Sequence, residues 1–447
     1  MSNKGDRREG SLEAPTRHPL AWRTDEFYDD DALEGELERV FDICHGCRRC
    51  FNLCHAFPTL FDAIDESESM ELDTVNKKVY WDVVDQCYLC DMCYMSKCPY
   101  VPPHEWNVDF PHLMLRAKAV RFAKQGASIR DRVLRATDTV GKLAGIPIMV
   151  QAVNATNRSK AGRKLLEKTL GVHRDAPVPA YFSKSARKRL KKHKQEQGAD
   201  ATATENTRGR VVLFTTCYGN RNMPWLAEDL VAIYEHNNIP VALADRESCC
   251  GMPSFELGDL QAVHKAKQQN IPQLIDWVSR GWDIVTPIPS CTLMFKQELP
   301  LMFPDDPDVL KVRDAMYDPF EYLMLRHKDG YLNTEFRNSL GKIAYQVACH
   351  LRVQNIGPKT RDLLTMVPDT RVDAIERCSG HDGTYAVKKE FHDISKKIAR
   401  PVVNKVKKGD AAHFVSDCPM AAEQIAAGLD DYAAESPLGL LRKAYGI

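Results

Sequence analysis

Short apolar runs alternate with longer amphipathic segments throughout the second half of the chain, and the same order occurs there twice. The apolar runs are short enough for β-strands, while the longer segments space their apolar positions three or four residues apart, as helices do. The expected strands span residues 210–215, 240–244, 282–287, 342–348, 371–376 and 412–415. The expected helices among them span residues 225–236, 260–280 and 385–406. Alternating strands and helices predict parallel sheets covered by helices, an α/β architecture.

The first half of the chain shows helical spacing and few strand signals. Residues 111–134 and 165–170 are rich in Leu, Ala, Arg and Lys, so we expect an α-helical domain there. A strongly basic run at 184–194 and a polar run at 195–208 follow. Their composition is typical of a solvated linker, and contact with anionic lipid or an acidic partner is the alternative. The expected fold class is therefore α + α/β.

The expected organisation has five parts along the chain. They are an acidic N-terminal extension (1–40), a helical domain (41–180), the linker (181–208), a first α/β repeat (209–330) and a second α/β repeat (331–447). A chain of 447 residues is long enough for two to four domains, each with its own core.

Composition limits the classes of function. The 61 acidic and 61 basic side chains balance, so the net charge indicates no nucleic-acid partner. No apolar run reaches the ~18 residues of a transmembrane helix, and residues 1–40 lack the apolar core of a signal peptide. We therefore expect a cytoplasmic protein, with peripheral attachment to the inner face of the membrane as an open option. In that reducing compartment, 15 cysteines indicate metal binding or catalysis rather than disulfides.

Eight of the cysteines form two closely spaced motifs in the helical half. The first motif is a C-x2-C-x2-C-x3-C run, and the second has one more residue before its last cysteine, which a proline follows. The two motifs consist of Cys44, Cys47, Cys50 and Cys54, and of Cys87, Cys90, Cys93 and Cys98. Such runs hold cubane iron–sulfur clusters in bacterial ferredoxins. Zinc sites use two separated pairs of cysteines instead, so two [4Fe-4S] clusters are expected, with zinc as the alternative.

The last cysteine of each motif is expected to ligate the cluster of the other motif. Three thiolates two residues apart wrap around one cluster, and in two-cluster ferredoxins the fourth reaches the other one. Cys98 would then complete the first set, and Cys54 the second. His45 and His55 lie within the first motif, and we expect them to tune the potential by hydrogen bonding rather than to ligate.

The remaining seven cysteines follow the expected strands of the two α/β repeats in the same order. The first repeat has Cys217, Cys249, Cys250 and Cys291, and the second has Cys349, Cys378 and Cys418. The nearly constant separation of matching cysteines indicates an internal duplication. All seven follow the carboxyl end of a strand, the edge where open α/β sheets bind ligands.

The residues around these cysteines resemble the cysteine-rich CCG domain. The matching segments are residues 247–253 and 290–291 of the first repeat, and residues 348–352, 378–385 and 416–419 of the second. This domain occurs twice in the B subunit of heterodisulfide reductase and in the C subunit of anaerobic glycerol-3-phosphate dehydrogenase, which also has two ferredoxin-type motifs before it. From about residue 41 onward the chain resembles this order of two ferredoxin-type motifs followed by two CCG domains. A fusion of the C and B subunits of heterodisulfide reductase would have the same order. The N-terminal stretch is also similar to the iron–sulfur oxidoreductases associated with rubrerythrin, a peroxide-reducing diiron protein.

The first repeat departs from the five-cysteine pattern of the domain at one position, where Met294 replaces the last cysteine. Four thiols are still enough for one cluster, so the first repeat is a candidate for a third iron–sulfur cluster. Its expected ligands are Cys217, Cys249, Cys250 and Cys291.

The second repeat has lost two of the five cysteines, and Arg377 and Ala421 stand at those positions. Three cysteines could hold a metal with an open coordination position, hold one completed by His350 or His381, or hold none. An open position is what a catalytic metal needs. The candidate catalytic residues are therefore Cys349, Cys378 and Cys418.

The resemblance implies an iron–sulfur electron-transfer protein or oxidoreductase subunit. Electrons would pass through two [4Fe-4S] clusters to the CCG site, and on to a quinone, a disulfide or a protein acceptor such as a rubrerythrin-type peroxide reductase. The chain has no P-loop and no dinucleotide-binding fingerprint, so a redox partner of dehydrogenase or peroxide-reductase type is expected. The alternatives are a disulfide or thiol reductase acting at the CCG site, and a non-enzymatic iron–sulfur scaffold or redox sensor.

Overall fold

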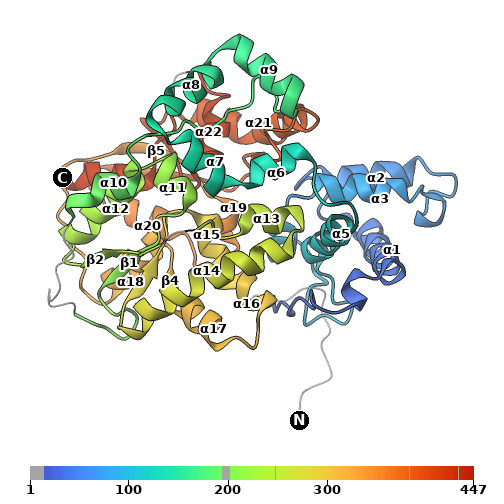
Figure 1. Cartoon of the computed structure of the whole chain (residues 1–447), viewed down its shortest axis with the longest axis horizontal. Helices are drawn as coiled ribbons and strands as arrows, with labels where there is room; N and C mark the ends of the chain where they lie inside the picture. Colours follow the sequence, from blue (N-terminus) through green and yellow to red (C-terminus); the bar gives the residue numbers. More distant parts are fainter. Residues whose placement is uncertain (1–14, 194–201, 247, 382, 431) are drawn as a thin grey trace. The chain divides into compact units, whose positions relative to one another are not determined.

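The computed structural model describes residues 15–193, 202–246, 248–381, 383–430 and 432–447 (Figure 1). Two compact units make up the chain. The N-terminal unit comprises Met1–Ala127 and the short segment Ser254–Leu260, and the sheet-containing unit comprises Ser128–Pro253 and Gln261–Ile447. This division differs from the boundaries expected at residues 180 and 208. The first 14 residues of the expected extension and residues 194–201 of the expected linker lie outside the described residues.

Helices form the N-terminal unit, as expected. They are η1 (Glu26–Tyr28), α1 (Asp30–Cys47), α2 (Ala56–Asp65), η2 (Leu72–Thr74), α3 (Lys78–Gln86), α4 (Met92–Ser96), α5 (Phe110–Gln125) and most of α13 (Met252–Leu257). An aromatic core holds α1, α2 and α5 together, because the ring of Phe110 lies 4.8 Å from that of Phe57 and 6.1 Å from that of Phe41. The cysteine motifs lie at the ends of the helices that this core fixes.

The described part of the N-terminal extension, from residue 15 on, is an integral part of this unit. Trp22, Phe27 and Leu33 are all buried. Asp29 caps α1, because its carboxylate accepts a hydrogen bond from the Ala32 amide at 2.8 Å. These residues of the expected acidic extension therefore belong to the core of the N-terminal unit, because apolar side chains lie among the acids.

The continuous helix expected over residues 111–134 is two helices, α5 and α6. Gly126, in the left-handed region with a φ of +68°, ends α5, and Ser128 caps α6 (Ile129–Arg135). Three further helices follow in the sheet-containing unit: α7 (Thr137–Ala144), α8 (Pro147–Arg158) and α9 (Lys160–Leu170).

The first repeat contains a parallel four-stranded sheet with the strand order β2-β1-β3-β4. Its strands are β1 (Val211–Leu213), β2 (Val241–Leu243), β3 (Asp283–Val285) and β4 (Met316–Tyr317). Val211 of the central strand lies opposite both Val241 and Asp283. The helices between and after the strands are α11 (Cys217–Arg221), α12 (Trp225–His236), α14 (Leu260–Ser279), α15 (Pro289–Leu293), η4 (Met294–Glu298), α16 (Leu299–Met302), α17 (Pro307–Asp314) and α18 (Pro319–Lys328). The three expected strands are confirmed, and β4 is an addition.

The second repeat contains a parallel three-stranded sheet with the order β6-β5-β7. Its strands are β5 (Gly341–Gln346), β6 (Thr370–Ile375) and β7 (His413–Ser416), and its helices are α19 (Cys349–Arg352), α20 (Lys359–Thr365), α21 (His392–Gly409), α22 (Pro419–Ala426) and α23 (Pro437–Tyr445). Where the first repeat has β4, the described residues of the second form an isolated parallel bridge between Val415 and Glu435. Helix α21 begins later than expected, because the chain before it turns and Lys388 pairs with Val172.

The basic run before the first repeat is folded rather than solvated. Its residues form α10 (Ala186–Arg189) and η3 (Leu190–Lys192). Arg187 donates to the Asp245 carbonyl at 3.0 Å, and His193 Nε2 lies 2.8 Å from the Val241 carbonyl oxygen. The expected linker is therefore docked on the first repeat as far as residue 193, because Arg187 and His193 contact backbone carbonyls of β2 and of the residues that follow it.

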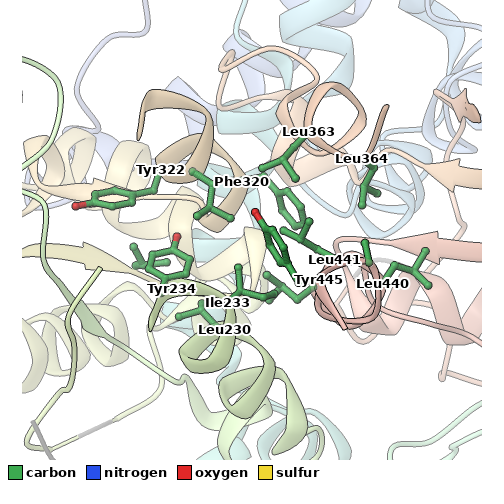
Figure 2. Packing of buried hydrophobic residues seen from close by; sticks show 14 of the residues in the cluster. Leu230, Ile233, Tyr234, Phe320, Tyr322, Leu363, Leu364, Leu440, Leu441 and Tyr445 are labelled. Carbon is green, nitrogen blue, oxygen red and sulfur yellow. The ribbon is translucent and has the colours of Figure 1, made fainter. Parts of the chain in front are cut away.

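One hydrophobic core joins the two repeats. Side chains of α12, α18, α20 and α23 meet between the two sheets, as Figure 2 shows. Tyr234 and Tyr322 stack with 5.8 Å between ring centroids, and the Tyr234 hydroxyl donates to the Pro319 carbonyl at 2.9 Å. Leu441 and Tyr445 of the last helix are fully buried in the same core. The second repeat therefore folds against the first rather than beside it.

Replacing Leu441 by Ala should lower the free energy of unfolding of the sheet-containing unit by about 2–5 kcal/mol, because it leaves a cavity in the shared core. Chemical denaturation followed by circular dichroism measures this loss. The matched control is Leu165→Ala, whose side chain is 59% exposed and whose loss should change stability by less than ~0.5 kcal/mol. Equal effects of the two substitutions would contradict a core shared at this position.

Candidate metal centres

The eight motif cysteines of the N-terminal unit gather into two sets of four. After burial, the groups that raise the pKa of the Cys44 thiol are Cys50, Cys98 and Cys47. Those that raise the pKa of the Cys93 thiol are Cys50, Cys90, Cys87 and Cys54, and the last three line one pocket together with Cys93. We therefore assign Cys44, Cys47, Cys50 and Cys98 to the first set, and Cys54, Cys87, Cys90 and Cys93 to the second. Each set takes three thiols from one motif and the last thiol from the other. This is the crossing that ferredoxin-type ligation requires, while ligation itself stays a prediction.

The second set lines a single pocket of the N-terminal unit. The residues around this pocket are Leu53, Cys54, Phe57, Cys87, Tyr88, Leu89, Cys90, Asp91, Cys93, Phe110 and Pro111. Four thiols that converge in a mostly apolar enclosure fit an iron–sulfur cluster, because thiolates ligate iron and the apolar wall limits access of water.

The backbone between the cysteines adopts conformations that most side chains avoid. Leu89 and Asp91 of the second motif have φ angles of 56° and 60°, and Arg48 of the first has 52°. Such left-handed residues are costly for non-glycine side chains and concentrate at functional sites. The additional residue before Cys98 is absorbed in a tight turn, because the Cys98 amide donates to the Cys93 carbonyl at 2.9 Å.

Burial makes several thiols of the N-terminal unit weaker acids. Burial raises the pKa of Cys87 and Cys50 to about 12, and that of Cys98 to about 11. These thiols are therefore protonated at neutral pH unless a metal replaces the proton. Loading of the sets must release protons, and a bound metal would offset the cost of burying thiolates.

The two sets lie close to each other. Among the charged neighbours that raise the pKa of the Cys93 thiol, Cys50 of the other set has the largest effect. Two redox centres held by these sets would therefore be direct neighbours inside one helical unit.

A buried arginine stabilises the loop of the second motif. The Arg17 guanidinium lies 2.5 Å from the Asp91 carboxylate and 2.8 Å from the Asp109 carboxylate, and its side chain is only 6% exposed. Burial tends to raise the pKa of Asp109, but the charge and hydrogen bond of Arg17, together with the charge and backbone amide of His112, lower that pKa to about 2. Sequence reasoning missed Arg17, because a single arginine in a polar N-terminal stretch carries no signal of a buried ion pair.

The four cysteines of the first repeat form a chain of thiols at one sheet edge. The Cys249 thiol contacts those of Cys217 and Cys250, and the Cys250 thiol contacts that of Cys291. These hydrogen bonds lower the pKa of Cys249 well below its ordinary value, whereas the pKa values of Cys217 and Cys250 are raised. The structure thus brings together all four predicted ligands of the first repeat, one of them already favouring the thiolate that metals bind.

Two residues around this set were not expected from the sequence. Asp138 of α7, far outside the repeat, accepts a hydrogen bond from the Cys249 amide at 2.6 Å. Thr216, directly before Cys217, has a φ of 66° that a β-branched residue rarely adopts. The sequence could have indicated Thr216, because it lies directly before the candidate ligand Cys217. It could not have indicated Asp138, because that residue reaches Cys249 only through the tertiary structure.

The second repeat presents its cysteines at the corresponding sheet edge. Cys349 begins α19 after β5, Cys378 follows β6, and Cys418 caps α22 after β7. Burial, together with the nearby His350, lowers the pKa of His381 to about 4, so this imidazole is neutral at physiological pH. Its buried Nε2 has no hydrogen-bond partner among the described residues.

The cysteine sites of the two repeats are neighbours. His350, next to Cys349, places Nδ1 2.8 Å from the Ser290 hydroxyl, and Ser290 precedes Cys291. Tyr218, next to Cys217, has Glu423 and Cys418 among the groups that, after burial, raise its pKa. One hydrogen-bond contact and one electrostatic interaction therefore relate the four-thiol set to the second repeat.

Across the described ranges, no group of three or more His, Cys, Asp or Glu side chains has the geometry of a formed metal site. The four-sulfur sets are gatherings of thiols at the expected positions, and the assignment of each as a ligand set is a proposal.

Comparison with known proteins agrees with this arrangement. The family model of the cysteine-rich CCG domain matches residues 211–296 and 343–425. The chain therefore contains two copies of this domain, and the resemblance expected from the sequence is confirmed.

Two kinds of relative match this chain over most of their own length. The C subunit of anaerobic glycerol-3-phosphate dehydrogenase from Escherichia coli K12 is 24% identical over 76% of this chain and 82% of its own length. Lactate utilization protein A is 27% identical in Bacillus cereus G9842, over 47% of this chain and 87% of the relative, and 26% identical in Oceanobacillus iheyensis, over 46% and 84%. The chain is thus homologous to both kinds of protein, which indicates an iron–sulfur oxidoreductase subunit.

Replacing Arg17 by Met should destabilise the N-terminal unit by about 3–5 kcal/mol, because the buried carboxylate of Asp91 and the partly buried carboxylate of Asp109 lose their cation. Because the folded pKa of Asp109 is about 2, its stabilisation is complete above an unfolded pKa of about 4 and disappears as the pH falls through 2. Unfolding of the variant should therefore begin at higher pH. The control Arg371→Met removes a 76% exposed partner of Asp373 and should cost less than ~1 kcal/mol. Acid and urea unfolding of both variants measure this, and equal losses would contradict the role of Arg17.

Replacing Asp138 by Asn should raise the reduction potential of a centre held by the first repeat by on the order of 100 mV, because it removes a negative charge beside Cys249. EPR-monitored redox titration measures the shift. The control Asp276→Asn changes a 62% exposed carboxylate on α14 and should leave the potential unchanged. No shift in Asp138→Asn, or the same shift in both variants, would contradict this assignment.

Proposed function

We propose that this chain is the electron-transfer subunit of an oxidoreductase, with iron–sulfur clusters in the N-terminal unit and in the first CCG repeat. The observation that carries the proposal is the exchange of Cys54 and Cys98 between the two thiol sets. Neither a zinc ribbon nor a chance gathering of core cysteines requires that exchange, but a pair of ferredoxin-type clusters does. When bound, the clusters would supply one-electron redox chemistry.

The residues of the N-terminal unit would bind two of these clusters, enclose them and compensate the charges around them. Phe57, Phe110 and Leu89 form apolar walls of the pocket, which keeps water from the thiolates. Arg17 compensates the two carboxylates beside the second motif. Cys50 and Cys93 bring the two sets next to each other, so an electron would cross a short distance between them.

In the first repeat, Cys217, Cys249, Cys250 and Cys291 would hold a third cluster. Asp138 fixes the Cys249 backbone through its amide. The contact between Ser290 and His350 then leads from this set to the second repeat. This single contact of 2.8 Å lies between a residue next to Cys291 and a residue next to Cys349.

The second repeat is the proposed site of the electron acceptor. Cys349, Cys378 and Cys418 are at the ends of its strands. The neutral His381 and the half-buried Glu423, whose pKa is raised by burial, are groups that could exchange protons there. Reduction of a quinone or a disulfide consumes protons as well as electrons, and a protein acceptor consumes electrons. These three are the acceptor classes that we propose.

The proposed electron donor is a dehydrogenase-type partner. The support comes from the name of the Escherichia coli relative, which is part of a dehydrogenase. This chain has two thiol sets in the N-terminal unit, one set in the first repeat and three cysteines in the second. It is therefore suited to receive electrons from such a partner and to pass them on. A thiol reductase working at the second repeat is the second candidate, favoured by its three cysteines beside a neutral His381.

The full chain purified without oxygen should contain about twelve irons, and Cys217→Ser should reduce this to about eight while the two ferredoxin-type signals persist. Cys98→Ser should change the EPR signal of the first set and Cys54→Ser that of the second. The control Cys378→Ser should keep the full iron content, and under the thiol-reductase alternative it abolishes disulfide reduction. Iron and sulfide analysis with EPR of the reduced protein measures these outcomes. Zinc in place of iron would contradict the proposal.

A further inference from the structure

Four large apolar side chains stand in solvent at the junction between α7 and α8. Leu143 is 58% exposed, Ile146 47%, Ile148 80% and Met149 47%. Single exposed apolar residues are common on folded proteins, but four within seven positions form a local patch that usually marks a binding surface. Neither the candidate metal centres nor the shared core uses these side chains.

Helix α8, which begins at this junction, lacks the usual support of a buried face. None of its residues from Pro147 to Arg158 is buried, although a short helix normally depends on burying one face. Its neighbours are α7 and α9. Figure 1 shows α8 and α9 together at one margin of the sheet-containing unit. On α9, Leu165 is 59% exposed and continues the apolar surface.

Positive charges on α7, α8 and α9 outnumber the acids of these helices. Exposed cations on α7, α8 and α9 without an ion pair among the described residues are Lys142, Arg158, Lys160, Lys164 and Lys168. The acids of α6 to α9 are engaged elsewhere: Asp131 pairs with Lys388, Asp138 accepts from the Cys249 amide, and Glu167 pairs with Arg174. The surface therefore presents a positive field together with exposed apolar side chains.

We propose that the surface formed by α7, α8 and α9 docks on a lipid bilayer with anionic headgroups. The apolar tip from Leu143 to Met149 would enter the boundary between headgroups and acyl chains, and the lysines would lie against the phosphates. Net positive charge is complementary to such a surface. None of the helices in the described ranges is long and apolar enough to cross a bilayer, so this contact would be peripheral.

A bilayer explains the observations better than a protein partner does. Protein interfaces are depleted in lysine, and their central residues are apolar and aromatic over a broad area. Here, four of the five unpaired cations are lysines, and the apolar part is a small tip beside them. Because a headgroup layer is fluid, the apolar tip can insert into it without a partner surface of matching shape. The inference does not depend on the proposed electron transfer.

The test is co-sedimentation of the full-length, anaerobically purified protein with vesicles. Vesicles of equal parts phosphatidylglycerol and phosphatidylcholine should bind the protein, and vesicles of phosphatidylcholine alone should bind it at least tenfold more weakly. Raising the salt concentration should weaken binding to the anionic vesicles. Lys164→Glu should weaken it further, by about fivefold or more.

The decisive variant replaces Ile148 and Met149 by Asp, and it should lose binding to the anionic vesicles by more than tenfold. Since both side chains are exposed, folding and iron content should not change. The control Met70→Asp makes the same kind of change at a 65% exposed apolar residue of the N-terminal unit and should bind as the unaltered protein does.

Three outcomes would overturn the proposal. The first is no binding to anionic vesicles by the unaltered protein at low salt. The second is equal binding by the double variant and the unaltered protein. The third is a dimer of the unaltered protein, seen by sedimentation velocity, that the double variant does not form, because the surface would then be an interface between two copies of this chain.

Discussion

Parallel pairing of strands is the constraint on which the arrangement of the larger unit depends. In each repeat a central strand pairs in parallel with a neighbour on both sides, β1 with β2 and β3, and β5 with β6 and β7. Parallel strands all end at the same edge of a sheet, so residues far apart in the chain leave the sheet side by side. The four thiols of the first repeat meet for this reason. Antiparallel pairing of any one strand would have sent its cysteine to the opposite edge.

The N-terminal unit brings its thiols together in a different way. No sheet is present among its described residues, and short turns with left-handed residues such as Leu89 and Asp91 direct the cysteines inward. Such turns are costly, and the ion pairs of Arg17 with Asp91 and Asp109 hold one of them in place. A strained loop that is fixed by a buried charge network is suited to a centre that must not rearrange when its charge changes.

Loss of cysteines from the second repeat has left its fold intact. It packs against the first repeat through the shared core of α12, α18, α20 and α23, and it has a second core of its own that includes Val402, Phe414 and Ile425. The contact between His350 and Ser290 still links this repeat to the four-thiol set. A repeat that keeps its fold and its contact while losing ligands is free to take up a different chemistry from its copy.

The sequence by itself determined the local and periodic features of this protein. Apolar periodicity identified the three strands of each repeat, and the spacing of the cysteines predicted which thiols would gather, because a motif of a few residues and the direction of parallel strands restrict where side chains can lie. Only the tertiary structure decided which distant residues support them. Arg17, Asp138 and Ser290 act through contacts with partners 60 or more positions away, and no pattern along the chain encodes such contacts. The same holds for residues 129–170, whose helices were assigned to the N-terminal half by composition but pack with the sheets.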